Sequence, residues 1–261
     1  MKIGLTQMDI VWEDKDANKI KIRKLAQKAS EKNVDMLVFP EMTLTGFTMN
    51  TELAGEEMLF SETLKFFKDM SRDYDMAVVF GFVEDFGGEY YNKLMVAAGG
   101  RIIYEYDKIH PFNYSDEGEH YVGGHEVKTG EYKGVNFSGF VCYDLRFPEI
   151  FQAVADDVDV IYVIANWPKV RLLHFETLLR ARAIENQCYV VGVNRIGDGN
   201  GIEYAESSMA FDPSGERLTK AHSKSELMVV DIDEHVVSEI REKYPFRKDR
   251  QVELYKSFYG K

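Results

Sequence analysis

The chain has 261 residues, 45% of them hydrophobic, and a formal net charge of −12 at pH 7; this is enough apolar material for one large domain and excludes a disordered chain. The negative charge argues against a nucleic-acid-binding protein, because phosphate contacts need concentrated Lys and Arg, and no apolar run approaches the roughly 18 residues of a membrane span. Two cysteines cannot form a disulfide framework and the first residues lack a signal-peptide pattern, so the sequence indicates a cytoplasmic protein that handles a small molecule.

Strand and helix patterns alternate in the first half of the chain. Near-continuous apolar runs indicate buried strands, apolar residues three and four apart indicate helices, and two glycine pairs indicate antiparallel hairpins. The predicted elements are, in order, a strand over 2–9, a helix over 17–33, a strand over 34–41, a helix over 62–74, and strands over 75–85, 90–98 and 101–108.

The second half repeats this order of elements. The stretches "VDMLVF" and "VDVIYV" match between the halves, as do "AVVFGFV" and "YVVGVNR". The predicted elements are a strand over 135–144, a helix over 148–157, a strand over 158–167, a helix over 175–187, a strand over 188–201, a hairpin over 203–212 and 216–222, and a closing strand over 225–233.

This repeat predicts an α/β fold made of a single domain. Two halves related by a pseudo-twofold axis pack most economically with sheet against sheet and helices outside, which gives a four-layer α-β-β-α sandwich. The alternative, two independent domains, lacks a linker to support it. Matching the strand ends places Gln7 opposite Cys142, and Glu41 opposite Ala165 or Asn166. Polar groups therefore gather at the carboxyl ends of strands, where α/β sheets commonly bind ligands.

Three chemically useful side chains follow predicted strands. Glu41 comes after an apolar run, where partial desolvation suits a carboxyl group to proton transfer; the alternative is an N-cap or a surface turn. Lys108 ends another strand, where a fixed ammonium can stabilise an oxyanion, although most lysines at strand ends are merely solvated. Cys142 is either a small buried residue or a nucleophile.

Its neighbours set Cys142 apart from Cys188. A predicted helix begins shortly after Cys142, so the helix dipole and nearby backbone amides would favour the thiolate and help to hold an oxyanion. Cys188 lies in an apolar strand and is expected to be a core residue. The sequence therefore favours a nucleophilic role for Cys142.

The histidines give no comparable pattern. His110, His120 and His125 lie near carboxylates but lack the spacing of a metal motif. We therefore expect these side chains to have packing roles, and we expect no metal site.

Three segments in this order, "FPEMTLTGF", "YDKIHPF" and "CYDLRFPE", resemble the nitrilase (carbon–nitrogen hydrolase) superfamily, and the resemblance covers nearly all of residues 1–261. It implies an α-β-β-α sandwich with a Glu–Lys–Cys catalytic set. By motif, Glu41 matches the general base, Lys108 the oxyanion-stabilising lysine and Cys142 the nucleophile. The family's second glutamate matches Glu117, because an apolar residue follows four positions later and a glycine seven positions later.

Within the superfamily the chain is similar to ω-amidases, through "CYDLRFPE", "ANWPKVR", "RARAIENQ" and "NRIGDGNG". This implies hydrolysis of the terminal amide of 2-oxoglutaramate or a similar 2-oxo acid amide through a cysteine thioester, with no metal or organic cofactor. The alternatives are another small amide, such as a deaminated-glutathione-like compound, a non-catalytic binder on the same fold, and a cysteine redox sensor. The intact Glu–Lys–Cys set argues against a binder, and the lack of a nearby resolving cysteine argues against a sensor.

The expected pocket residues Phe47, Asn166 and Trp167 follow strand ends on the side of the catalytic residues, whereas the expected assembly comes from the resemblance. Arg146 is expected to be structural and paired with a carboxylate. The C-terminal tail, about residues 240–261, contributes to dimer contacts in related enzymes, and its aromatic residues are compatible with a homodimer: Tyr244, Phe246, Tyr255, Phe258 and Tyr259. The residues expected to contact the substrate are Phe47, Asn166 and Trp167, with Arg171 for an anionic group and the backbone amide of Tyr143 for the oxyanion.

Overall fold

The computed structural model describes residues 1–221 and 223–259, and its first sheet comes almost entirely from the first half of the chain. The strand order is β13-β1-β2-β3-β4-β5. Its three central strands β1, β2 and β3 run parallel, whereas β4, β5 and β13 pair antiparallel with their neighbours. The strands are β1 (Lys2–Thr6), β2 (Met36–Val38), β3 (Ala77–Phe86), β4 (Glu89–Ala98), β5 (Arg101–Asp107) and β13 (Leu227–Asp231).

The second sheet repeats this pattern with strands from the second half, in the order β12-β9-β8-β7-β6. β7, β8 and β9 run parallel, and β12 pairs antiparallel with β9, as β4 does with β3. This confirms the internal duplication that the sequence predicts. The strands are β6 (Gly130–Tyr132), β7 (Val135–Val141), β8 (Val160–Ala165), β9 (Tyr189–Asn194) and β12 (Met209–Phe211); a separate hairpin comprises β10 (Gly197–Gly199) and β11 (Ile202–Tyr204).

Helices and short helical turns connect these strands. The α-helices are α1 (Lys15–Ser30), α2 (Thr51–Ala54), α3 (Glu62–Asp73), α4 (Glu117–His120), α5 (Pro148–Val154), α6 (Leu172–Asn186), α7 (Glu234–Lys243) and α8 (Val252–Tyr259). The 3₁₀ turns are η1 (Asn113–Ser115), η2 (Cys142–Arg146), η3 (Lys169–Arg171) and η4 (Phe246–Asp249).

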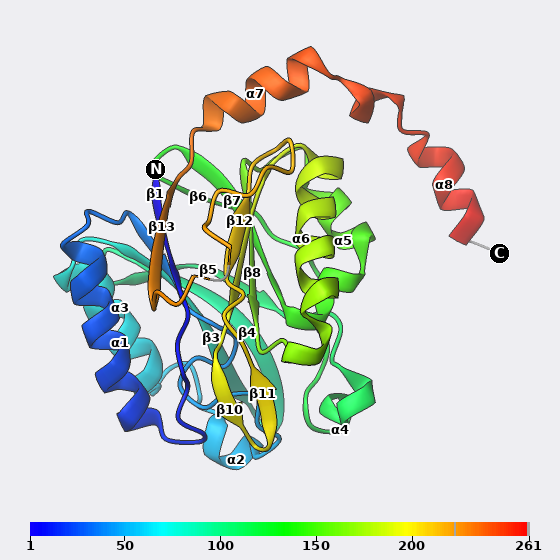
Figure 1. Ribbon diagram of the computed structural model, residues 1–261. Helices are drawn as coiled ribbons and strands as arrows, with labels where there is room; N and C mark the ends of the chain where they lie inside the picture. Colours follow the sequence, from blue (N-terminus) through cyan, green and yellow to red (C-terminus); the bar gives the residue numbers. More distant parts are fainter. Residues whose placement is uncertain (222, 260–261) are drawn as a thin grey trace.

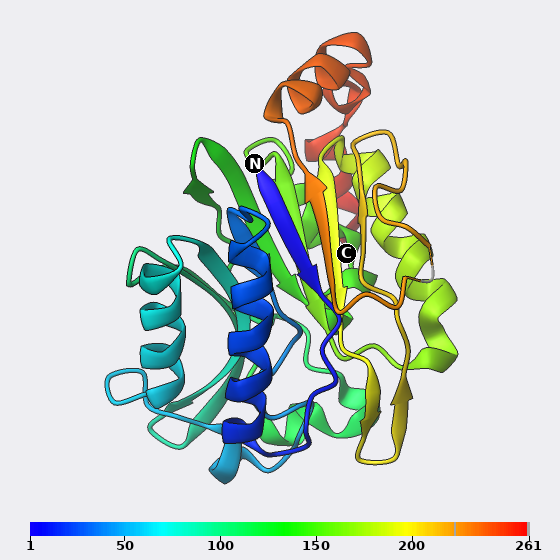
Figure 2. The same ribbon diagram turned by 60° about the vertical axis from the view of Figure 1, so that its left-hand side comes forward.

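Helices cover the outer face of each sheet, and the two sheets pack against each other (Figure 1, Figure 2). α1 and α3 lie on the first sheet, and α5 and α6 lie on the second. Successive strand residues point to opposite faces: Val38 and Val79 belong to the core between the sheets, whereas Leu37 and Phe80 belong to the core beneath α1 and α3. The architecture is the predicted four-layer α-β-β-α sandwich.

Side-chain caps define the start of both helices on the first sheet. Asp14 accepts a hydrogen bond from the Ala17 amide, and Ser61 accepts one from the Leu64 amide, each at 2.9 Å. Such caps satisfy amides that have no partner inside the helix. α6, on the second sheet, follows the turn η3 and has no side-chain cap at its start.

The structure corrects two sequence predictions in the last third of the chain. The closing strand pairs antiparallel with β1 and completes the first sheet rather than the second, because the outer edge of β1 would otherwise leave its backbone groups unpaired. The predicted hairpin over 203–212 and 216–222 shortens to β12 and one bridge, Phe211 to Arg217; residue 222 lies outside the described residues.

The C-terminal tail leaves the sandwich, and α8 extends away from the body (Figure 1). Arg241 and Arg247 anchor its first part by donating to backbone carbonyls near the ends of α5 and α6. The predicted dimer role of the tail stays a prediction, and residues 260–261 and the side chain of Tyr259 lie outside the described part.

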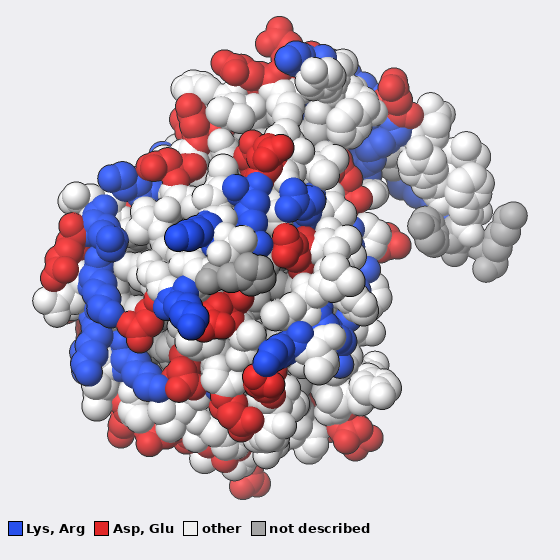
Figure 3. Space-filling view, in the orientation of Figure 1, with Lys and Arg blue, Asp and Glu red and all other residues white. Residues whose placement is uncertain are grey.

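The surface carries mixed charge in the view of Figure 3, where Lys and Arg gather over α1 and acidic groups are scattered elsewhere. None of the described helices combines the length and apolar character that crossing a membrane requires.

Candidate active site

The strand ends at one edge of the sandwich bring the predicted catalytic side chains together. Glu41 follows β2, Lys108 follows β5, Cys142 follows β7 and Glu117 begins α4. The side chains of Glu41, Lys108 and Glu117 are at most 1% exposed. Charged groups this deeply buried need partners, since an unpaired buried charge is very costly.

A glycine lets the Glu41 segment lie close to β3. A Cβ atom on Gly81 would come within 2.1 Å of the Met42 nitrogen, so a larger residue would push this segment away. Met42 has a φ of 45°, and the chain therefore turns sharply after Glu41. The Gly81 amide donates to Thr43 Oγ1 at 2.8 Å, which fixes the turn to the strand.

The ammonium of Lys108 lies between two carboxylates. Its Nζ donates to Glu41 Oε1 at 3.0 Å and to Glu117 Oε1 and Oε2 at 2.9 and 2.8 Å. Burial alone would lower the pKa of Lys108, but Glu117 and Glu41 raise it well above its ordinary value, so the amine stays charged. Burial raises the pKa of Glu117, and the nearby Glu41 adds to the rise while Lys108 opposes it.

Asn92 completes this cluster, and no sequence pattern indicates its role. Its Nδ2 donates to Glu41 Oε1 at 2.8 Å and to Glu117 Oε1 at 3.0 Å, so it bridges the same two carboxylates as Lys108. The Asn92 carbonyl also accepts from the Lys108 amide at 2.9 Å. Asn92 therefore fixes the distance between the two carboxylates independently of the lysine charge.

The surroundings of Cys142 disfavour the thiolate and raise the pKa of its thiol, contrary to the sequence expectation. Burial, and then the negative charge of Glu41, raise its pKa well above the ordinary value, although Lys108 opposes this. The predicted helix begins at Pro148, as expected, but the turn η2 (Cys142–Arg146), which Cys142 opens with a φ of 47°, lies between the thiol and the start of α5. A nucleophilic role for this thiol therefore requires a base.

Asn166 connects Cys142 with Glu41. Its backbone amide donates to Glu41 Oε2 at 2.9 Å and its Nδ2 donates to the Glu41 carbonyl at 2.8 Å. Its own carbonyl oxygen lies 4.0 Å from Cys142 Sγ. The carboxylate and the sulfur thus both neighbour one residue, Asn166.

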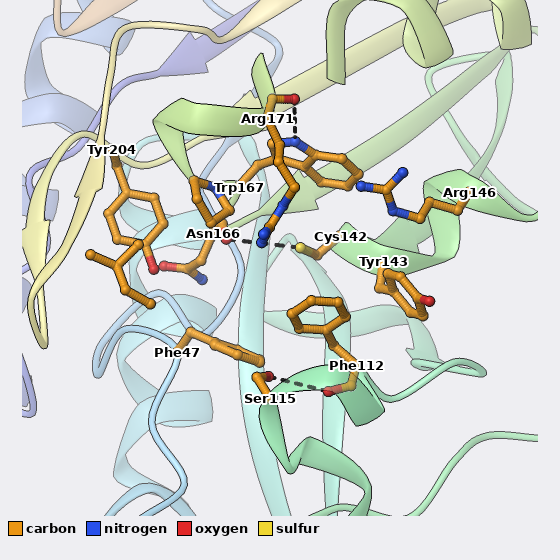
Figure 4. A pocket seen from close by; sticks show the side chains of 12 residues that line it. Phe47, Phe112, Ser115, Cys142, Tyr143, Arg146, Asn166, Trp167, Arg171 and Tyr204 are labelled. Atoms are coloured by element: carbon orange, nitrogen blue, oxygen red, sulfur yellow. Dashed lines mark hydrogen bonds between the residues drawn. The ribbon is translucent and has the colours of Figure 1, made fainter. Parts of the chain in front are cut away.

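Cys142 opens onto a pocket with about 470 Å³ of empty space, its open mouth included. In Figure 4, Trp167 and Arg171 lie on one side of Cys142, and Phe112 and Phe47 lie on the other. The indole Nε1 of Trp167 donates to the Arg171 carbonyl at 2.8 Å, which holds the ring in place. All five residues expected to contact the substrate line this pocket: Phe47, Tyr143, Asn166, Trp167 and Arg171.

The expectation of a carboxylate partner for Arg146 is wrong. None of the described carboxylates lies within salt-bridge distance of Arg146, and its guanidinium lies 4.8 Å from the centre of a Trp167 ring and 5.9 Å from that of Tyr143. It lines the pocket instead. Aromatic faces attract a cation without neutralising it, so Arg146 keeps its charge available to a ligand.

Sequence reasoning also missed part of the pocket wall. Phe112 belongs to the segment "YDKIHPF", so its signal in the sequence is an aromatic residue close to Lys108. Tyr204 offered none, because only the β10–β11 hairpin brings it to the pocket. The missed lining residues are Phe112, Ser115, Arg146, Pro168, Ile202 and Tyr204.

The histidines do not join the thiol. His110 Nδ1 lies 2.8 Å from Asp144 Oδ1, and its ring stacks on Phe147 with centroids 3.7 Å apart, as a packing role predicts. Within the described part of the chain, the one group of three metal-type ligands lies at the surface start of α7 and comprises Asp233, Glu234 and His235.

Comparison with known proteins connects this geometry with a family. The sequence profile of the carbon–nitrogen hydrolase family matches residues 2–242. The omega-amidase YafV of Escherichia coli strain K12 is 32% identical, over 95% of this chain and 96% of that protein. The 2-oxoglutaramate amidase of Bacillus subtilis is 34% identical, over 97% of this chain and 98% of that protein.

A solved structure agrees with the fold. The crystal structure of XC1258 from Xanthomonas campestris, described as a CN-hydrolase superfamily protein with an arsenic adduct in the active site, superposes with a TM-score of 0.90. It is 28% identical, and the match covers 96% of this chain and 97% of that one.

Proposed function

Because the chain belongs to the carbon–nitrogen hydrolase family, we propose that it is a cysteine-dependent amidase that cleaves the terminal amide of a small 2-oxo acid amide, of the 2-oxoglutaramate kind, to the carboxylate and ammonia. The relatives named omega-amidase and 2-oxoglutaramate amidase support this substrate class. The observation that carries the proposal is the buried cluster of Lys108 between Glu41 and Glu117, beside a thiol that opens onto a pocket.

In the proposed reaction Cys142 Sγ attacks the amide carbon while Glu41 takes the thiol proton. A base is required, because burial and the charge of Glu41 raise the pKa of the Cys142 thiol and so disfavour the thiolate. The C–N bond then breaks, Glu41 returns the proton to nitrogen, and ammonia leaves a thioester. Water, activated by Glu41, cleaves the thioester to the carboxylate and restores the thiol.

The oxyanion of each tetrahedral intermediate is stabilised by Lys108 and by the backbone amide of Tyr143. Lys108 suits this role because its raised pKa keeps it charged. Removing one oxyanion donor typically costs about 100- to 1,000-fold in rate. Glu117 and Asn92 hold Lys108 and Glu41 in position through their hydrogen bonds.

The charge of the pocket favours a substrate with a carboxylate. Two guanidinium groups, Arg146 and Arg171, line it, and none of the described residues that line it is acidic. A second charged group far from the reacting carbon fixes the orientation of a small substrate, since a bidentate guanidinium–carboxylate pair has a defined geometry. An ω-amide of a short dicarboxylic acid supplies both groups.

The decisive experiment measures ammonia release from 2-oxoglutaramate and from pentanamide, which has the same chain length without the charge. We expect 2-oxoglutaramate to be cleaved with the higher kcat/KM. Cys142→Ala should abolish turnover, whereas Cys188→Ala, the matched variant of the other cysteine, should retain it because Cys188 is fully buried in the core. Turnover by Cys142→Ala, or equal cleavage of both amides, would contradict the proposal. A parallel assay with deaminated glutathione separates the ω-amidase from its alternative.

We also propose that the chain is one domain, with a tail that forms a homodimer. The support is a set of exposed apolar side chains on α8, namely Val252, Leu254, Tyr255 and Phe258. Light scattering after size exclusion should give a dimer for the full chain and a monomer after deletion of residues 250–261. A monomeric full chain would contradict this.

A cytoplasmic location is proposed because both cysteines are free and the nucleophile must stay reduced. Fractionation of cells that express the chain should find it with cytoplasmic markers.

A further inference from the structure

A buried carboxylate outside the catalytic cluster makes four hydrogen-bond contacts. Asp144 is fully buried and does not line the pocket. Its Oδ1 accepts from the His110 amide at 3.0 Å and lies 2.8 Å from His110 Nδ1. Its Oδ2 accepts from the Tyr106 hydroxyl at 2.9 Å and from the Val141 amide at 3.1 Å.

The donors to Asp144 lie next to two of the catalytic residues in the chain. Tyr106 lies two residues before Lys108 and His110 two residues after it, while Val141 immediately precedes Cys142. One side chain therefore ties both flanks of the lysine to the residue next to the sulfur. Lys108 and Cys142 come from different sheets, so the Asp144 contacts cross the interface between the two halves.

We propose that Asp144 is a positioning residue that sets the distance and direction between the Lys108 ammonium and Cys142 Sγ, and so the geometry of the oxyanion site. This rests on the proposed amidase function. It goes beyond it because Asp144 touches neither the pocket nor the catalytic side chains and acts through the backbone on either side of them.

The surroundings hold the donors in place. The His110 ring stacks on Phe147, and Phe147 packs edge-on against Tyr143 with centroids 5.2 Å apart. The Tyr106 hydroxyl accepts from the Ile109 amide at 3.3 Å. No Lys or Arg lies within salt-bridge distance of Asp144 among the described residues, so oriented donors compensate its charge, and their loss leaves it uncompensated.

The donor pattern also explains why an isosteric amide cannot replace the carboxylate. Each oxygen of Asp144 receives one backbone N–H, from His110 or from Val141. An asparagine must turn its NH₂ group toward one of them, and two donors then face each other whichever way the amide is oriented. The backbone must move on one flank, next to Lys108 or next to Cys142.

The experiment compares Asp144→Asn with Asp159→Asn in the full-length chain, with 2-oxoglutaramate as substrate. Asp159 is the matched control, because its carboxylate also accepts a backbone N–H, from Asn136 at 2.9 Å, at the other end of the same sheet. A misplacement of about 1 Å costs roughly 100-fold in rate. We expect kcat of Asp144→Asn to fall about 100-fold with KM within about twofold, and kcat of Asp159→Asn to stay within about twofold.

A second readout separates positioning from loss of the fold. Alkylation by iodoacetamide needs the Cys142 thiol and an open pocket but forms no oxyanion, so Asp144→Asn should still incorporate one label that Cys142→Ala lacks. His110→Asn keeps a donor near the place of Nδ1 and should retain most of kcat, whereas His110→Leu should lose it. This pair decides the question if Asp144→Asn does not fold.

Three outcomes would overturn the inference. They are a folded Asp144→Asn with kcat within about threefold of the wild type, a loss confined to KM, or equal activity of His110→Asn and His110→Leu. If the wild-type chain is active and any of these outcomes is found, the positioning role of Asp144 is contradicted and the proposed amidase function is not. A wild-type chain that releases no ammonia from any ω-amide would contradict the proposed function, and the inference with it.

Discussion

The two halves of the sandwich have the same scaffold and use its strand ends differently. Gln7 follows β1 and Cys142 follows the matching strand β7. The Gln7 amide donates to the carbonyls of Ser223 and Ser225 and accepts from the Ser208 amide. Gln7 thus holds the segment before β13 against the first sheet, whereas Cys142 presents a thiol to the pocket.

The next pair of strand ends meets at the site. Glu41 follows β2, Asn166 follows β8, and the two are in contact through the Asn166 backbone amide and side chain. The duplication therefore brings equivalent positions face to face, and divergence has made one an acid and the other an amide. The proposed chemistry arises where the halves differ, on strands where they match.

The largest expected effect on kcat concerns two buried lysines of the first half, one inside the catalytic cluster and one outside it. Lys108 and Lys93 each contact two carboxylates within 3.0 Å, but Lys93 pairs with Glu84 and Asp107. We expect Lys108→Met to lower kcat about 1,000-fold, because it removes an oxyanion donor and leaves two carboxylates facing each other.

Lys93→Met is the matched control for this prediction. It should lower the free energy of unfolding while keeping kcat within a few-fold, as measured by urea denaturation and by ammonia release. Comparable losses of kcat in both variants would mean that Lys108 acts only as a structural ion.

The matched strand ends should separate activity from stability. Asn166→Ala removes the side-chain bond to the Glu41 carbonyl, and we expect kcat to fall about tenfold or more. Gln7→Ala leaves two carbonyls and one amide without a partner, and we expect a loss of about 1–3 kcal/mol in unfolding free energy with kcat unchanged. Kinetics and denaturation of both variants check this; a reversed pattern would contradict the assignment.

The sequence predicted what depends on local pattern. Apolar runs marked the strands, and the rule that ligands gather at strand ends put Glu41, Lys108 and Cys142 at one edge, where the structure brings them together. Asn92 could not be found in this way. It lies inside a strand, and only the antiparallel pairing of β4 with β5 puts its carbonyl against the Lys108 amide.

The errors have a common cause, which is that partners distant in the chain override local signals. The closing strand looks like part of the second half, but its neighbour is decided by the free edge of β1. The expected thiolate rested on a nearby helix start, whereas burial and Glu41 dominate the pKa of Cys142. Arg146 was assigned to a carboxylate that the fold places elsewhere.

The two guanidinium groups that line the pocket also distinguish the halves, because both come from the second half. Arg146 ends η2 and Arg171 ends η3, while the first half supplies the uncharged Phe47. Arg171→Gln should raise KM for 2-oxoglutaramate about tenfold and leave KM for pentanamide unchanged, because only the first substrate carries a carboxylate. Equal changes for both amides would mean that Arg171 shapes the pocket without binding charge.

The smallest expected effect concerns the free energy of unfolding and the start of helix α3, where a carboxylate of the first half binds the first turn. Glu56 binds the start of α3: it accepts from the Ser61 hydroxyl at 2.6 Å, and from the Thr63 hydroxyl and amide at 2.5 and 2.9 Å. Lys15 donates to it at 2.7 Å. Among the described residues, no side chain caps the start of α6 in this way.

This difference predicts a pH dependence of stability. Burial would raise the pKa of Glu56, but hydrogen bonds from Lys15 and from the start of α3 outweigh it and lower the pKa from 4.5 to about 2. Since the folded pKa is depressed, the stabilisation is fully present above about pH 4.5 and is lost as the pH falls toward 2. Glu56→Gln should therefore cost about 1 kcal/mol in unfolding free energy at pH 7, after allowance for solvent screening. The difference in unfolding free energy between Glu56→Gln and the wild type should decrease as the pH is lowered. A difference that is constant from pH 7 to 3 would show that the carboxylate charge contributes nothing to the cap.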